Sequence, residues 1–254
     1  MKNLFHDFAT AFQFLTRLPL NWLEYRPGAL ARAAKFFPLV GLLIGATQAG
    51  IYVLLAPHLP LVVVAILVVL YSVFVTGGLH EDGLADVADA FGGGWNKLQT
   101  LAIMKDSRIG VYGALAILFS IMIRVFLLAC LPVASVMPLL ISAEVLSRWT
   151  ILPLGAVLPD ARANEEHPSG SVQAARIAHR ISRTSLLFGT VLAFAIVGLF
   201  LHLSMWKPIV AAFSVLLLSG LYYKHRLNGV TGDCFGATVQ LTTLAIYLCG
   251  AWIA

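Results

Sequence analysis

The stretch GGLHEDGLADVADAFGGGWNKLQTLAIMKDSRIGVYG, from Gly77 to Gly113, interrupts a chain that is otherwise almost continuously apolar. The apolar runs on either side of it decide the fold class, and the charged residues within it are the first candidates for chemistry. It holds five of the twelve acidic residues of the protein: Glu81, Asp82, Asp86, Asp89 and Asp106.

The composition is that of a membrane protein. Of the 254 residues, 59% are hydrophobic and 11% are charged, and the mean hydropathy is +0.88. Apolar runs of about 20 residues recur along the chain, which is the length that a helix needs to cross a bilayer. The sequence therefore predicts an all-α, polytopic helical bundle that is integral to the membrane, with residues 1–254 forming a single catalytic domain.

We expect about seven membrane-spanning helices after an N-terminal helix that lies at the membrane interface. Residues 3–20 mix Phe and Leu with polar side chains, which is typical of an interfacial amphipathic helix. The first span contains Gly41 and Gly45, and this small-xxx-small spacing favours close packing of helices. The seven expected spans cover residues 36–56, 60–78, 110–131, 133–157, 184–204, 208–223 and 235–253.

The distribution of lysine and arginine predicts the orientation. If the N-terminus is cytoplasmic, fourteen of the seventeen basic residues fall in segments on the cytoplasmic side, in agreement with the positive-inside rule. This orientation puts the C-terminus outside and the polar loops in the cytoplasm. It also explains the net charge of +5 without nucleic-acid binding, for which the sequence has no motif.

The motifs of several enzyme classes are missing. There is no GxSxG elbow, P-loop or HExxH sequence, so neither a serine nucleophile nor a zinc hydrolase is indicated. The three cysteines have no CxxC spacing and predict neither a zinc site nor a disulfide framework.

Asp82, Asp86 and Asp89 fall on one face of a helix, at positions i, i+4 and i+7, and we call them the acidic row. Glu81 lies beside this face and can close the same site from the side. Carboxylates at this spacing repel one another, and a hard divalent cation such as Mg²⁺, which prefers oxygen ligands, removes that repulsion. The alternative is a solvated acidic helix face, which a position at the end of a membrane segment disfavours. We therefore predict a metal site, to which Asp233 adds a further ligand.

The segment KDSRIGVYG suits an anionic substrate that carries phosphate, because its Lys and Arg follow the acidic helix closely. Anchoring at the membrane edge is the alternative for such basic residues. The preceding glycines permit close approach of a ligand to the backbone, with a flexible linker as the alternative. The residues assigned to chemistry or substrate binding here are Lys105, Asp106, Ser107, Arg108, Gly92 and Gly93.

The segment RLNGVTGD, residues 226–233, has the same ingredients at another cytoplasmic edge of the membrane. Its glycines allow backbone N–H groups to face an anion. Arg226 and Thr231 are candidate substrate contacts, and Asp233 is the candidate metal ligand. Together with the acidic row, this segment predicts two half-sites that face one cytoplasmic pocket.

Other ionisable residues lie near or inside the apolar segments. Glu144 and Arg148, at i and i+4, predict a local ion pair, although Arg148 can also reach a phosphate. Arg124 is expected to be structural or to extend its side chain outward. His80 is either a base or ligand beside Glu81 or a partner in a helix-end hydrogen bond.

Two motifs, GGLHEDGLADVADAFGGG and IMKDSRIGVYGALA, closely resemble the cobalamin synthase family of adenosylcobinamide-GDP ribazoletransferases, also called cobalamin-5′-phosphate synthases. The resemblance extends to FLTRLPL near the start, FFPLVGLLIG at 36–45 and NGVTGDCFGA at 228–237. It implies a bacterial inner-membrane enzyme that requires Mg²⁺. Such an enzyme joins adenosylcobinamide-GDP to α-ribazole or α-ribazole 5′-phosphate, releases GMP and forms adenosylcobalamin or its 5′-phosphate. A homo-oligomer, or association with other enzymes of late cobamide assembly, stays open.

In the reaction that this resemblance implies, a ribose hydroxyl attacks the corrinoid-side phosphorus of a pyrophosphate, and GMP leaves. The acidic row, together with Glu81, would hold one or two Mg²⁺ ions that bridge the pyrophosphate. Lys105, Arg108 and Arg226 would neutralise phosphate oxygens. Either Asp89 or Asp106 would accept the proton of the hydroxyl.

Two other functions stay open. A CDP-alcohol phosphotransferase is one, because Asp82-Gly83-Leu84-Ala85 is similar to the DGxxA core of that family; however, Leu79 stands where its first Asp would fall and Asp86 where an Arg would follow. An ion transporter that uses the acids as its ion site is the other, although transporters tend to place such groups near the bilayer midplane.

Overall fold

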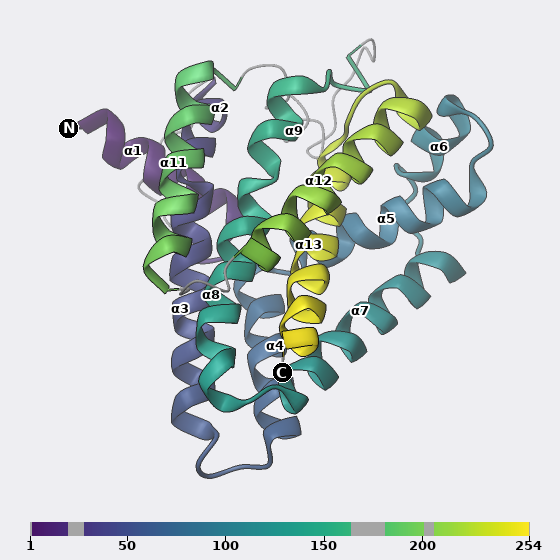
Figure 1. Ribbon diagram of the computed structural model, residues 1–254. Coiled ribbons are helices and arrows are strands. Elements are labelled where there is room, and N and C mark those ends of the chain that lie inside the picture. Colours follow the sequence, from purple (N-terminus) through teal and green to yellow (C-terminus); the bar gives the residue numbers. More distant parts are fainter. Residues whose placement is uncertain (1, 20–27, 164–180, 201–205, 254) are drawn as a thin grey trace.

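The computed structural model describes residues 2–19, 28–163, 181–200 and 206–253, and Figure 1 shows the path of the chain. Within these residues every regular element is a helix, and one isolated bridge joins Asp160 to Val230. The predicted all-α class is confirmed. The elements are α1 (Lys2–Leu15), α2 (Ala29–Ala33), the 3-10 helix η1 (Ala34–Phe36), α3 (Phe37–Leu55), α4 (Leu61–Thr76), α5 (Leu79–Gly93), α6 (Lys97–Ile103), α7 (Val111–Cys130), α8 (Val133–Trp149), α9 (Ile151–Val157), α11 (Arg183–Phe200), α12 (Trp206–Leu227) and α13 (Gly232–Ile253).

Six stretches of the described chain are helical, long and apolar enough to cross a membrane, and α4 with α5 passes the same test only as a pair bent by 88°. We treat α4 as the crossing part of that pair and α5 as lying outside it, which gives the predicted number of about seven spans. Residues 201–204 of the fifth expected span lie outside the described residues. The six stretches are Ala29–Leu55, Val111–Cys130, Val133–Val157, Arg183–Phe200, Trp206–Leu227 and Gly232–Trp252.

The bend between α4 and α5 is made by Gly77 and Gly78. Both have positive φ, 65° and 70°, a region that residues with a Cβ rarely adopt. Their N–H groups donate to the carbonyls of Phe74 and Val73, at 3.1 and 2.9 Å, and so close the last turn of α4. The side chain of Arg17 packs directly against Gly77. This double glycine therefore directs α5, with its carboxylates, away from the axis of α4.

Helix α1 packs on the bundle with one face. Ala11 and Leu15 are fully buried, and the ring of Phe14 stacks on that of Phe37 with 5.8 Å between centroids. Asp7 is also buried, and its carboxylate accepts a hydrogen bond from Lys35 Nζ at 2.8 Å. The predicted N-terminal helix is present but ends earlier than expected, at Leu15.

Helices α3 and α8 approach closely at the two glycines of the small-xxx-small pattern. A Cβ atom on Gly41 would lie 2.8 Å from the carbonyl carbon of Glu144, and one on Gly45 would lie 2.8 Å from the Ile141 Cα. Larger side chains would force the helices apart, so the prediction of close packing at this pair is confirmed. Helices α8 and α9 together, Val133–Val157, form the most deeply buried of the six stretches.

The connections between helices divide between the two ends of the bundle. Figure 1 shows the short α3–α4 and α7–α8 connections at one end, and α2, α6 and α9 toward the other. Helix α13, in yellow, runs through the bundle beside α5 and α12. The first turn of α13 therefore lies at the same end as α6 and α9.

Candidate active site

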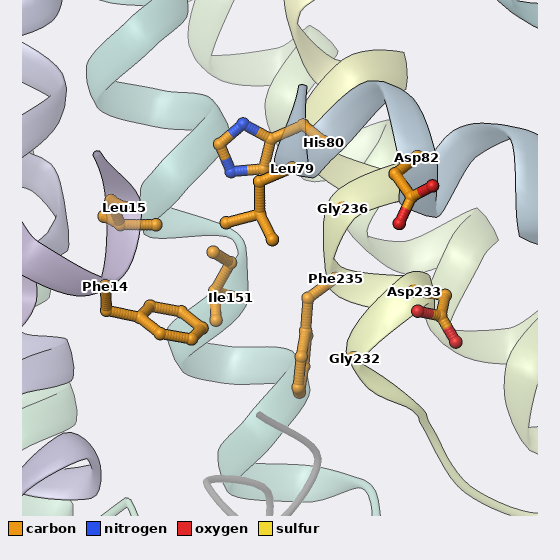
Figure 2. A pocket seen from close by; sticks show the side chains of 10 residues that line it. All are labelled: Phe14, Leu15, Leu79, His80, Asp82, Ile151, Gly232, Asp233, Phe235 and Gly236. Atoms are coloured by element: carbon orange, nitrogen blue, oxygen red, sulfur yellow. The ribbon is translucent and has the colours of Figure 1, made fainter. Parts of the chain in front are cut away.

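Helices α5 and α13 cross at a pair of glycines, and this crossing brings the two charged segments together. A Cβ atom on Gly83 would lie 2.8 Å from the backbone oxygen of Asp233, and one on Gly236 would lie 3.3 Å from the Gly83 Cα. Asp233, in the first turn of α13, therefore stands beside the acidic row. Figure 2 shows the carboxylates of Asp82 and Asp233 on neighbouring helices, turned to the same side.

Asp86 reports the crowding of negative charge. Its pKa is raised to about 7, first by burial and then by the charges of Asp233, Asp82 and Asp89, while Arg162 acts in the opposite direction. Four carboxyl groups from two helices thus influence one another. A bound cation would relieve this repulsion.

The donors of this cluster fit a hard cation. Asp82 is exposed, Asp86 is half-buried, and the largely buried Asp233 keeps 11% of its side-chain surface exposed, so water reaches all three. Among the described residues, no three His, Cys, Asp or Glu side chains are arranged to hold one ion as they stand. Mg²⁺ usually keeps several waters and takes only one or two carboxylates plus phosphate oxygens of a substrate. Such a partial protein shell is what these residues offer.

Asp89 binds the backbone at the start of α7. Its two carboxylate oxygens accept hydrogen bonds from the N–H groups of Gly110, at 2.7 Å, and Gly113, at 2.9 Å. A Cβ atom on Gly113 would lie 3.0 Å from the Ala85 carbonyl oxygen, so the glycine lets α7 approach α5. Asp89 therefore ties the KDSRIG segment to the acidic row, a role that sequence analysis did not assign to it.

Glu81 points into the bundle and not toward the acidic row. Its Oε1 accepts hydrogen bonds from Arg124 Nη2 at 3.1 Å and Gln240 Nε2 at 2.9 Å, and all three residues are buried. These two hydrogen bonds give Glu81 buried structural partners that the sequence did not predict, and its place in the metal set stays a prediction. This placement also decides the open choice for Arg124, which forms a structural ion pair and does not extend outward.

Arg148 is held inside α8 by its own helix. It forms the predicted ion pair with Glu144, and both side chains are buried. The Arg148 side chain is 1% exposed, which favours the structural alternative, and a contact between Arg148 and a phosphate stays a prediction.

The loop between α6 and α7 carries an exposed ion pair. Asp106 accepts hydrogen bonds from the backbone N–H of Arg108 at 3.0 Å and from its Nη2 at 2.6 Å. These hydrogen bonds lower the pKa of Asp106 to about 2, which makes it a weak proton acceptor. Lys105 and Ser107 are exposed in the same loop.

Arg226 closes the C-terminal end of α5. Its Nη2 donates to the Gly94 carbonyl at 2.5 Å, and its Cζ lies 5.1 Å from the ring centroid of Phe91. Gly92 and Gly93 are exposed here, and a Cβ atom on Gly92 would lie 2.5 Å from the ring of Tyr112. Arg226 therefore lies next to the glycine tract, and the contact of these residues with substrate stays a prediction.

Thr231 orients Asp233. It is fully buried, and its hydroxyl lies 3.3 Å from Asp233 Oδ2 as a donor and accepts from the Cys234 N–H at 3.4 Å. Thr231 therefore holds the Asp233 carboxylate in place from the buried side.

Arg162 is the residue that sequence analysis missed. Its side chain is 1% exposed, and its Nη2 lies 4.0 Å from Asp233 Oδ2. Within the described residues, neither its Nε nor its Nη2 has a hydrogen-bond partner. Unused guanidinium donors beside a carboxylate cluster are suited to an oxyanion.

Hydrogen bonds between the backbones of residues 159–161 and Val230 position Arg162. The N–H of Ala161 donates to the Val230 carbonyl at 2.9 Å, and the N–H of Val230 donates to the Pro159 carbonyl at 2.8 Å. Asp160 Oδ1 accepts the N–H of Arg162 at 2.9 Å. The only sequence signal was an Asp two residues before an Arg, which is a common turn pattern.

Two hollows adjoin Asp82. The apolar hollow has a volume of about 110 Å³ and opens toward Asp82 and Asp233. The polar hollow, of about 600 Å³, lies between α1 and the start of α5. The walls of the apolar hollow include Phe14, Leu15, Leu79, His80, Ile151 and Phe235, and those of the polar hollow include Gln13, Thr16, Arg17, Thr76, Glu81 and Asp82.

Comparison with protein families matches residues 7–251 to the family described as cobalamin-5-phosphate synthase. The chain belongs to this family. The match covers every residue of the candidate site, and the resemblance noted in the sequence is confirmed. Synthases of this family are transferases of cobalamin biosynthesis. Family membership therefore favours an enzyme over the ion transporter, the alternative that the sequence left open.

Similar proteins of known name cover nearly the whole chain. Proteins called adenosylcobinamide-GDP ribazoletransferase occur in Sinorhizobium medicae, with 38% identity over 97% of this chain and 96% of that protein, and in Polaromonas sp. strain JS666, with 37% identity over 95% of each. The protein of that name from Shewanella woodyi is 38% identical over 95% of this chain and 93% of its own length. No solved structure matches this synthase.

Proposed function

We propose that this protein is an adenosylcobinamide-GDP ribazoletransferase. It would transfer the adenosylcobinamide phosphate group to α-ribazole or α-ribazole 5′-phosphate and release GMP. The names of its relatives support this activity. The observation that carries the proposal is the crossing of α5 and α13, which gathers Asp82, Asp86 and Asp233 beside Arg162, whose Nε and Nη2 have no hydrogen-bond partner among the described residues.

The reaction exchanges one phosphorus–oxygen bond for another. The ribose hydroxyl oxygen bonds to the corrinoid-side phosphorus, the bond from that phosphorus to the bridging oxygen breaks, and GMP leaves with the electron pair. Asp82, Asp86 and Asp233 would hold Mg²⁺, which when bound shields the charge of the pyrophosphate. The N–H groups on Nε and Nη2 of Arg162, which have no partner among the described residues, would bind a phosphate oxygen and stabilise the charge that develops on it.

The hydroxyl proton needs an acceptor at this site. Of the two candidates, Asp106 is disfavoured because its pKa is lowered to about 2. Asp89 is fixed by two backbone N–H groups, and each of its oxygens keeps another lone pair. We assign proton acceptance to Asp89, and an Asp89→Asn variant with unchanged kcat would rule this out.

The end of the bundle that carries the site would face the cytoplasm of a bacterial inner membrane. Most of the basic residues fall in segments at that end, as the positive-inside rule predicts. Nucleotide-activated substrates would then reach the site from the compartment in which nucleotides are made. Cysteine labelling of the 56–60 turn from outside intact cells would check this orientation.

The decisive experiment is turnover by the purified protein in lipid nanodiscs. With adenosylcobinamide-GDP, α-ribazole and Mg²⁺, we expect GMP release in a 1:1 ratio with corrinoid product, and loss of both on chelation of Mg²⁺. The same preparation is assayed with CDP-alcohols and α-ribazole 5′-phosphate. Release of CMP without any release of GMP would replace the proposal with the phosphotransferase alternative.

A further inference from the structure

The two hollows beside Asp82 share a wall. Phe14, Leu79 and Asp82 line both of them, so two ligands seated in the two hollows would meet at this carboxylate. A transferase with two substrates needs two subsites that meet at the reacting atoms. Nothing else in the site described above explains why a polar hollow and an apolar hollow should adjoin the same aspartate.

We propose that the apolar hollow binds the heterocyclic base of the nucleoside acceptor and that the polar hollow binds the corrinoid end of the donor. This proposal rests on the proposed function and assigns each of its substrates to a place. The ribose of the acceptor would then lie at the mouth, between the base and Asp82.

The apolar hollow has the shape and chemistry of a site for a flat ring. Figure 2 shows the rings of Phe14 and Phe235 on opposite sides of it, with Leu79 and Ile151 between them and His80 above. Aromatic and aliphatic walls suit the faces of a bicyclic base. A volume of about 110 Å³ admits such a ring system and is too small for a corrinoid.

His80 supplies the polar contact for the edge of that ring. The residue is 4% exposed, and its Nε2 has no hydrogen-bond partner among the described residues. A buried polar atom without a partner is costly, and a ligand that completes its hydrogen bond gains affinity. A base with a free ring nitrogen, such as the benzimidazole of α-ribazole, would satisfy it.

The polar hollow suits a much larger ligand rimmed with amides and phosphate. Gln13 offers both donors and acceptors, and Arg17 offers a cation. Thr16 and Thr76, whose hydroxyls donate to the Phe12 and Ser72 carbonyls, offer acceptor lone pairs. Glu81, whose Oε2 has no hydrogen-bond partner in the described residues, also lines it. The corrinoid ring carries several amide side chains and would pair with these groups, whereas an apolar base would leave them unsatisfied.

The first test fills each hollow separately and measures KM for both substrates. Ile151→Phe should raise the KM for α-ribazole about tenfold or more and leave the KM for adenosylcobinamide-GDP within twofold of the wild type. Gln13→Phe should do the reverse. Ile209→Phe, a matched change of a half-buried residue on α12, should alter neither value. Equal changes in both KM values, or changes with the substrates exchanged, would overturn the assignment.

The second test uses a matched pair of acceptors. Ribosylindole has the bicyclic shape of a ribosylbenzimidazole but carries CH in place of the free ring nitrogen. The wild type should bind the benzimidazole form about tenfold more tightly by calorimetry, and His80→Leu should abolish that preference without weakening ribosylindole. A preference that survives His80→Leu would remove His80 from the subsite.

The two proposals fail separately. If the wild-type protein released no GMP, the proposed function would fall, while calorimetry without donor would still report whether Ile151→Phe blocks binding of the nucleoside. If GMP were released normally and Ile151→Phe left the KM for α-ribazole unchanged, the base subsite alone would be wrong.

Discussion

Glu81 and Asp82 are neighbours on α5, yet the structure treats their charges in opposite ways. Glu81 is buried and receives hydrogen bonds from Arg124 and Gln240. Asp82 is exposed and lies near Asp86 and Asp233, and two nitrogens of the neighbouring Arg162, Nε and Nη2, have no hydrogen-bond partner in the described part of the chain. A carboxylate that is paired with a buried arginine serves the fold, and carboxylates that crowd one another are available to a ligand.

Removing a charge from the uncompensated group should have the largest effect. Asp82→Asn and Asp86→Asn are each expected to lower kcat by about 10³-fold or more, because metal-assisted phosphoryl transfer loses several kcal/mol of charge stabilisation without its ligands. Relief of repulsion should leave the unfolding temperature unchanged or higher. Both values are measured on the protein in nanodiscs, by GMP release and thermal unfolding. Near-normal turnover of both variants would remove the acidic row from the mechanism.

Removing one member of the compensated group should act on stability. Arg124→Met leaves the Glu81 carboxylate buried with only Gln240 as a donor, so we expect a loss of about 3 kcal/mol in the free energy of unfolding. The double variant Glu81→Gln/Arg124→Met should recover most of that loss, because neither charge is then left alone. Denaturant unfolding in detergent measures the cycle. Strictly additive losses would show that the two residues do not act as a pair.

Sequence patterns identified the carboxylates of α5 as a group, but did not separate the paired Glu81 from the crowded aspartates. The i, i+4, i+7 spacing placed three aspartates on one helix face, and the glycines of both segments indicated close approach. The pairing of Glu81 with Arg124 and Gln240 was not predicted, because the positions of these two residues relative to α5 depend on helix packing that periodicity does not specify. The same limit applies to Arg148. The sequence allowed either an ion pair with Glu144 or a contact with phosphate, and the burial of its side chain, which favours the ion pair, is known only from the structure.

Arg162 could not be found from the sequence for a related reason. Its position depends on the pairing of residues 159–161 with Val230 across a long separation in the chain, and no local pattern announces such a contact. A polar loop rich in charge usually reads as solvated surface. The burial of one arginine from that loop is a tertiary effect.

Replacement of Arg162 should reduce catalysis and not stability. We expect Arg162→Met to reduce kcat by about 10²-fold, since one charged donor to a developing oxyanion commonly contributes that much. Arg162→Lys, which keeps the charge and loses the planar pair of donors, should recover only part of the rate. GMP release at saturating substrate measures both variants. A fall in unfolding temperature with unchanged kcat would instead assign Arg162 to the structural group with Arg124.

The smallest effect should come from the bend between α4 and α5, which precedes both Glu81 and Asp82. Gly77 has a φ of 65°, and an L residue there costs about 1 kcal/mol. Gly77→Ala should therefore lower the free energy of unfolding by about that amount, or somewhat more because the Arg17 side chain lies against the glycine. Gly50→Ala is the matched control, since a Cβ atom on Gly50 meets nothing within 4 Å and its helix should gain stability. If the two variants unfolded alike, the left-handed turn would not be what holds α5, and hence the acidic row, at its angle to α4.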